Sequence, residues 1–126
     1  MTHPFIFWGA AHAALAVAMG AFGAHGLKAS LSPDLLAVYQ TGAQYHIFHA
    51  LGLLLVGVLA SHRPRALVTW AGWLLFAGIV LFSGSLYVLA ISGERWLGMI
   101  TPFGGTAFIA GWVLLAVASL RREAGA

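Results

Sequence analysis

The charged side chains of this sequence are confined to four short clusters. The six Lys and Arg residues and three Asp and Glu residues lie at positions 28–34, 63–65, 94–95 and 121–123. Four stretches without any ionised side chain lie before and between them, at 1–27, 35–61, 66–93 and 96–120. Each stretch is longer than the roughly 20 apolar residues that cross about 30 Å of hydrocarbon. The pattern predicts four transmembrane helices.

The composition supports a membrane protein and excludes several other classes. Hydrophobic residues make up 61% of the chain and charged residues 7%, whereas about 25% of a soluble domain is charged. A length of 126 residues predicts a single domain, 1–126. The net charge of +3 is spread over both ends of the spans, so we expect no nucleic-acid partner. The sequence has no cysteine, which excludes disulfides and thiolate metal sites.

Short loops between the spans predict an all-α membrane protein, an antiparallel up-down-up-down bundle. We expect spans at about 5–24, 34–60, 66–91 and 102–120. Ser32, Pro33 and Asp34 form a helix-start signal, because they supply a cap, a preset φ and a negative charge near the helix's positive end. The second helix is therefore extended at its N-terminus, with Tyr39 and the following turn expected at the interface.

The distribution of Lys and Arg predicts the orientation in the membrane. One side of the bundle holds Arg63, Arg65, Arg121 and Arg122, and the other holds Lys28 and Arg95. Cytoplasmic loops carry the excess of Lys and Arg, so we expect both termini on the cytoplasmic side of the membrane. No Lys or Arg precedes the first span, which predicts that this span is retained and not cleaved as a signal peptide.

Small residues recur at helical spacing in the first and fourth spans. Helices approach closely at small residues in lipid, where no hydrophobic drive acts between them. Packing inside the bundle is the first interpretation, and an interface with a second copy or a larger membrane complex is the alternative. Membrane lipids are expected around the rest of the surface. The predicted packing glycines are Gly9, Gly20, Gly23, Gly26, Gly84, Gly104, Gly105 and Gly111.

Polar side chains at membrane depth are the candidates for function. In the second span Tyr45, His46 and His49 lie within one turn, and His25 ends the first span. Antiparallel helices would bring His25 toward this turn. His12 lies roughly 20 Å deeper than His25 by helical rise, so we expect it outside the cluster. The hypothesis is a ligand site formed by His25, Tyr45, His46 and His49.

Three interpretations of this cluster stay open. The histidines can be structural, forming hydrogen bonds between helices. For Ser83 and Tyr87 we likewise expect a structural role, either a bond back to a backbone carbonyl or a bond between helices. They can bind a metal or haem through His25, His46 and His49, because imidazole suits Zn, Cu and Fe. They can transfer protons or act on a lipid or quinone as an enzyme would. No carboxylate lies at depth beside them, so no catalytic residue is assigned.

Four motifs together resemble one family of small membrane proteins. They are a glycine-flanked His25 in 20–27, the segment 39–52 with Tyr39-Gln40-Thr41-Gly42 and His49-Ala50-Leu51-Gly52, Phe82-Ser83-Gly84-Ser85-Leu86-Tyr87, and Thr101-Pro102-Phe103-Gly104-Gly105. This combination resembles the domain of unknown function 423 family over nearly the whole chain. The resemblance implies a four-span inner-membrane protein whose biochemical activity is not established. It carries over no catalytic residue.

A weaker likeness concerns small fluoride channels. Residues 104–108 half match the Gly-Gly-x-Thr-Thr-Phe-Ser pattern of such channels, but the second Thr and the Ser are missing and the chain has no Asn to line a pore. The sequence therefore favours a non-enzymatic accessory or scaffold protein, or a binder of a small apolar ligand. A metal or haem protein, an ion channel and a lipid- or quinone-modifying enzyme are the alternatives.

Overall fold

The computed structural model of this protein describes residues 3–121, and these residues are helical apart from short connections. Arg122 and Glu123, which the charge pattern includes, lie outside the described residues. The described chain contains no strand. In order, the elements are α1 (Pro4–His25), α2 (Pro33–His62), α3 (Ala66–Gly78), the π-helical turn η1 (Ile79–Ser83), α4 (Gly84–Ser92), the 3-10 turn η2 (Arg95–Met99) and α5 (Thr101–Leu120).

Four helical stretches in this order are long and apolar enough to cross a membrane. They are Pro4–His25, Pro33–His62, Ala66–Ser92 and Arg95–Leu120. The third stretch joins α3, η1 and α4, and the fourth joins η2 and α5. The prediction of an all-α chain with four membrane-spanning helices is confirmed.

The longest helix, α2, begins at the predicted signal. The Ser32 side chain accepts a hydrogen bond from the backbone N–H of Leu35 at 3.3 Å, and Pro33 and Asp34 form the first turn. Tyr39 in the early part of α2 is fully buried, because the end of α1 covers this side chain: the Tyr39 ring lies against Gly23. Gln40 and Gln44 of the same two turns are exposed.

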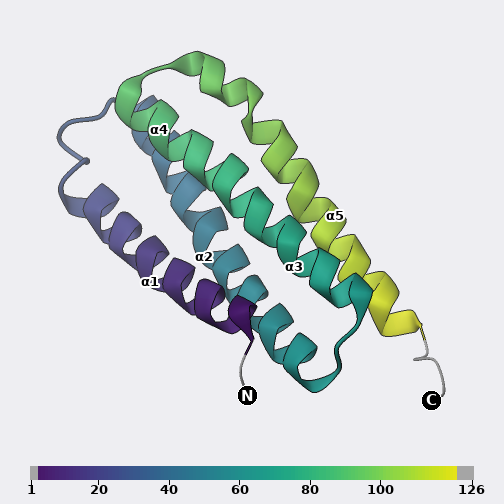
Figure 1. Ribbon diagram of the computed structural model, residues 1–126. Helices are drawn as coiled ribbons and strands as arrows, with labels where there is room; N and C mark the ends of the chain where they lie inside the picture. The colour runs from purple at the N-terminus through teal and green to yellow at the C-terminus, as the bar shows by residue number, and fades with distance from the viewer. Residues whose placement is uncertain (1–2, 122–126) are drawn as a thin grey trace.

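The remaining helices are arranged around α2 and α3. Contacts across each seam pair residues in reversed order: Gly9 of α1 lies against Leu54, and Gly57 lies against Ile6. In the same way, Gly104 of α5 lies against Phe82 and Gly111 lies farther down against Leu75. Consecutive spans therefore run in opposite directions, with α1 and α5 at opposite edges of the molecule (Figure 1).

The third span contains one irregular turn. At η1 the Gly84 N–H bonds to the carbonyl of Ile79, five residues back, instead of four. Such π-type turns are rare and occur often at functional sites. Ser83 ends this turn, is fully buried, and donates a hydrogen bond of 2.8 Å to the Gly42 carbonyl of α2. The turn thus joins the middle of the third span to α2.

The predicted packing glycines fall into two groups. A Cβ would meet another helix at Gly9, Gly23, Gly104 and Gly111. A Cβ at Gly26 would meet Phe22 of its own helix, one at Gly105 would lie 3.7 Å from the Phe82 ring, and Gly20 and Gly84 face no atom within 4 Å. The sequence interpretation missed further glycines that lie in tight interhelical contacts, namely Gly42, Gly52, Gly57, Gly72 and Gly78.

Candidate functional site

The polar centre of the bundle is a chain of hydrogen bonds between three side chains from three helices. His46 of α2 is 2% exposed. Its Nδ1 lies 2.9 Å from the Tyr87 hydroxyl of α4, and its Nε2 lies 3.0 Å from His12 Nδ1 of α1. We call His12, His46 and Tyr87 the His–Tyr relay. It connects α1 and the third span through α2.

Hydrogen-bond chemistry restricts how the relay is arranged. A neutral imidazole has one N–H donor and one acceptor nitrogen, so the relay runs in a single direction at any moment. When Tyr87 donates to His46 Nδ1, His46 donates from Nε2 to His12 Nδ1. The Nε2 of His12 then carries a proton and can donate to a further group. When the direction reverses, the same nitrogen becomes an acceptor.

The far end of the relay is the half-buried His12 ring, which lies beside α3. Among residues 3–121, no hydrogen-bond partner lies at His12 Nε2, and no buried side-chain nitrogen or oxygen lacks a partner. This nitrogen is therefore accessible. Aromatic rings flank it: the His12 ring centroid is 5.4 Å from that of Phe76 and 6.4 Å from that of Trp8. Trp8 is 42% exposed, so the half-buried imidazole lies beside an aromatic side chain at the surface of the bundle.

The depth of the relay explains why the four predicted residues do not gather in one cluster. His12 lies 13 residues before His25 at the end of α1, and His46 lies 13 residues after Pro33 at the start of α2. Both are therefore roughly 20 Å from the turn between the helices. The expectation that His12 lies outside the cluster assumed that His25 and His46 lie at the same distance from the turn between α1 and α2. The structure brings together His12 and His46.

The other predicted residues lie apart from the relay. His25 is exposed, and its Nδ1 lies 3.0 Å from the Ala21 carbonyl one turn earlier in its own helix. His49 is buried but faces α5: its ring stacks on Phe108 with centroids 3.5 Å apart, and its Nδ1 lies 2.7 Å from the Tyr45 carbonyl. Tyr45 is 40% exposed. One predicted residue, His46, belongs to the relay.

This arrangement bears directly on the metal hypothesis. No group of three or more His, Cys, Asp or Glu side chains within residues 3–121 is placed to hold a metal ion. His25, His46 and His49 do not converge, because His25 lies at the end of α1 and His49 turns toward α5. In the relay, His12 and His46 bond to each other. The geometry favours hydrogen bonding over coordination at these residues.

Comparison with known proteins assigns the chain to a family. Residues 19–105 match the family described as "Protein of unknown function (DUF423)". The chain belongs to the DUF423 family. It is 53% identical to the UPF0382 membrane protein YwdK of Bacillus subtilis over 118 residues, 93% of this chain and 96% of the relative. It is 50% identical to the UPF0382 membrane protein SERP0230 of Staphylococcus epidermidis over 117 residues, 93% and 95% of the two chains. No solved structure matches it.

The family assignment confirms the resemblance drawn from the motifs, and the relatives' names place this DUF423 protein among membrane proteins. Two of the motifs found in the sequence, 39–52 and 82–87, supply most of the polar core. Tyr39 donates a 2.6 Å hydrogen bond to the Met19 carbonyl, Ser83 bonds to Gly42 and Tyr87 bonds to His46. Of the two structural roles expected for Ser83 and Tyr87, these bonds confirm the interhelical hydrogen bond.

Proposed function

We propose that this DUF423 protein is a non-enzymatic binding protein of the membrane, in which His12 presents Nε2 to a small, largely apolar ligand. The observation that carries the proposal is the accessible Nε2 at the end of a hydrogen-bonded relay. A polar atom without a partner in hydrocarbon costs free energy. A ligand that reaches the seam between α1 and α3 from the bilayer and offers an oxygen atom would remove this cost.

The surroundings of His12 indicate the shape of such a ligand. Trp8 and Phe76 lie edge to face with ring centroids 5.6 Å apart, and both lie near the imidazole. Aromatic side chains favour planar apolar groups, which stack on them or pack against their edges. The relay can donate to an oxygen or accept from a hydroxyl. A quinone-like ring fits both requirements, and it is bound without being changed, since no carboxylate lies among these contacts.

Fluorescence quenching tests this proposal. A variant that keeps Trp8 and has phenylalanine at the other four tryptophans is placed in lipid nanodiscs and titrated with decylubiquinone. We expect saturable quenching that His12→Phe weakens at least about fivefold, as expected for the loss of one hydrogen bond of about 1 kcal/mol. His25→Phe is the matched control, because His25 bonds only within its own helix. Equal quenching in the His12 variant, or none that saturates in the starting protein, would contradict the proposal.

An accessory role in a membrane complex is the second candidate, and the open glycines favour it. A Cβ added at Gly20 or Gly84 would meet no atom of another helix within 4 Å, and a partner helix can approach closely at such positions. On this proposal the protein forms a homo-oligomer or joins a larger assembly through Gly20 of α1. Gly20→Leu is then expected to lower the mass of the complex measured in lipid-like detergent. An unchanged mass in this variant would exclude an interface at this glycine.

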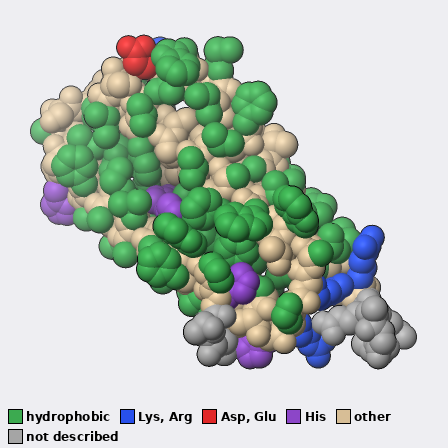
Figure 2. Space-filling model, in the orientation of Figure 1, with side chains coloured by type: hydrophobic (Ala, Val, Ile, Leu, Met, Phe, Trp, Pro, Cys, Tyr) green, Lys and Arg blue, Asp and Glu red, His purple; other side chains and the backbone are tan. Residues whose placement is uncertain are grey.

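We also propose the inner-membrane orientation that the charges favour, with both termini in the cytoplasm. Arg63, Arg65 and Arg121 line one groove at the end of the bundle where α2 and α5 end, and Figure 2 shows Lys and Arg side chains gathered at one end of the molecule. The sequence has no cysteine, so single-cysteine variants give clean labelling. Ser61→Cys is expected to resist an impermeant thiol reagent in intact cells, and Ser30→Cys in the opposite loop is expected to react. The reverse result would invert the orientation.

A further inference from the structure

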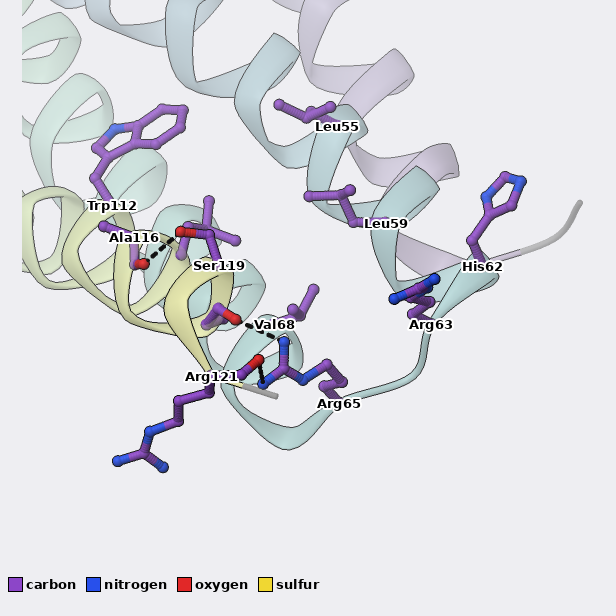
Figure 3. A pocket seen from close by; sticks show the side chains of 12 residues that line it. Leu55, Leu59, His62, Arg63, Arg65, Val68, Trp112, Ala116, Ser119 and Arg121 are labelled. Atoms are coloured by element: carbon purple, nitrogen blue, oxygen red, sulfur yellow. Dashed lines mark hydrogen bonds between the residues drawn. The ribbon is translucent and has the colours of Figure 1, made fainter. Parts of the chain in front are cut away.

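A groove separate from the relay lies between the C-terminal ends of α2 and α5 and the beginning of α3 (Figure 3). Its volume is about 880 Å³. The walls that face the membrane interior are apolar, formed by Leu55 and Leu59 of α2 and by Trp112 and Leu115 of α5. This groove lies on the α5 side of α2, whereas His12 lies on the α1 side.

One end of the same groove is cationic. Arg63, Arg65 and Arg121 line it there. The Arg65 guanidinium donates to the carbonyls of Ala118 at 2.6 Å and Arg121 at 3.3 Å, which closes the bottom of the groove (Figure 3). A guanidinium has five N–H donors, so Arg65 retains donors for a further acceptor.

The charge at this end is not balanced within the described chain. The two acidic residues in the range 3–121 are Asp34 at the start of α2 and Glu94 after α4, both at the opposite end of the bundle. The arginines lie where the helices leave the hydrocarbon, and the apolar wall continues inward. Leu55 lies eight residues before Arg63, which is about 12 Å along α2. The groove therefore presents positive charge at the surface and an apolar channel below it.

We infer that this groove binds one anionic phospholipid, with the phosphate at Arg63 and Arg65 and an acyl chain along Leu59 and Trp112. The charges of the groove and of such a lipid are complementary, and arginine donors suit phosphate oxygens. Each basic residue near an anionic membrane surface contributes about fivefold in affinity. An apolar ligand without the phosphate would leave the arginines without an acceptor, and a soluble phosphate would leave the apolar wall uncovered.

Native mass spectrometry of the full-length protein from detergent tests this inference. The probes are phosphatidylglycerol, phosphatidylcholine with the same acyl chains, and glycerol phosphate. We expect one phosphatidylglycerol per chain, bound at least about fivefold more tightly than phosphatidylcholine, and no bound glycerol phosphate. Equal binding of the two lipids would overturn the inference. Binding of glycerol phosphate as tight as that of the lipid would assign the site to free phosphate and overturn it equally.

Variants locate the site. Arg63→Gln is expected to reduce the preference about fivefold, and Arg95→Gln, which removes one charge at the opposite end, is expected to leave it unchanged. Ala116→Phe fills the groove wall and is expected to lower lipid binding while all arginines remain. Arg65 is left intact because it also joins α3 to α5. Equal losses in the Arg63 and Arg95 variants would show general attraction to anionic lipid and would refute a defined groove.

Discussion

The two outer helices are held to the bundle in different ways. Four residues of α1 are buried, and so are four residues of α5; two of the four are glycines in each helix. The middle of the α1 seam holds the bond between His12 and His46. The middle of the α5 seam holds instead the stacked rings of His49 and Phe108. Polar contacts of α5 lie toward its two ends, where Thr101 bonds to Ser85 and Ala118 bonds to Arg65.

This difference shows that glycine contacts alone do not determine the register of a helix against its neighbour. Close approach of backbones gives packing in lipid, but apolar surfaces there gain nothing from leaving water. A hydrogen bond in mid-membrane fixes register, because a shift of α1 by one turn would separate His12 from His46. Aromatic stacking on α5 tolerates small shifts better than a hydrogen bond does. We therefore expect the position of α1 to depend on its hydrogen-bond partners and the position of α5 to depend on the fit between packed side chains.

The largest expected effect tests the glycine contacts that both seams share. Gly9→Ala would bring a Cβ within 2.7 Å of the Leu54 Cα, and Gly104→Ala would bring one within 2.8 Å of the Phe82 Cα. Each change is expected to lower the free energy of unfolding by about 2 kcal/mol, as overpacking against backbone does. Unfolding by detergent titration measures it. Gly20→Ala, which meets no atom, is expected to be neutral or slightly stabilising; an equal loss there would show that helix propensity was misjudged.

The next largest expected effect distinguishes the contact of α1 with α2 from the contact of α5 with the bundle. His46→Phe leaves the Tyr87 hydroxyl and His12 Nδ1 without their shared partner, so we expect a loss of about 2 kcal/mol in the free energy of unfolding. His49→Phe is the matched change in the other seam, because it keeps a ring against Phe108 and removes only a bond within α2. We expect a loss below about 0.5 kcal/mol. If both variants lose the same free energy in the same titration, the two seams do not differ as described.

A double-mutant cycle tests the coupling inside the relay. Tyr87→Phe and His46→Phe are combined, and the interaction free energy is expected to be about 1 kcal/mol because the two side chains share one bond. The control cycle combines His46→Phe with Ser85→Ala, which breaks the separate bond to Thr101. Additive losses are expected there. Additivity in both cycles would mean that the Tyr87 bond contributes nothing to stability.

The smallest expected effect concerns the contact between the end of α1 and the beginning of α2. Tyr39→Phe removes the hydrogen bond to the Met19 carbonyl and leaves the ring against Gly23. A loss of about 0.6 kcal/mol, the average for such bonds in membrane proteins, should speed amide hydrogen exchange near Met19 about threefold. Tyr45→Phe, at a partly exposed ring of the same helix, is the control. Faster amide exchange near Met19 in the Tyr45→Phe control alone would show that the Tyr39 hydrogen bond does not hold this part of α1 to α2.

The four spans follow from the sequence because lipid excludes charge so strongly that nine residues mark every boundary. The start of α2 follows for a similar reason, since Ser32, Pro33 and Asp34 combine independent local preferences. The membership of the polar site does not follow so directly. His12 stands alone among alanines, and no local pattern distinguishes it. Counting 13 residues from each side of the turn would have paired it with His46.

Tyr87 could not be assigned to the relay by counting. Regular helix geometry gives the face of each residue from its position, but the third span contains a π-type turn before Tyr87. No local signal distinguishes Ile79–Ser83 from ordinary helix. The glycines show the same limit, because Gly9 and Gly20 are alike in sequence context and only one faces a neighbour.

The π-type turn at Ile79–Ser83 has a consequence for how this chain can change length. One residue corresponds to about 100° of rotation around a helix axis. The wider turn therefore determines which face of α4, the part of the third span after Ser83, meets α2. Removing a single residue there would restore a regular spiral and leave the tyrosine of the relay facing α2, because the wider turn accommodates one extra residue. Regularising the turn with that residue kept would instead rotate the tyrosine away from α2 by about 100°. An insertion of the same size in a loop would alter almost nothing. The position of the Tyr87 phenol thus depends on the one extra residue that the π-type turn adds to the third span.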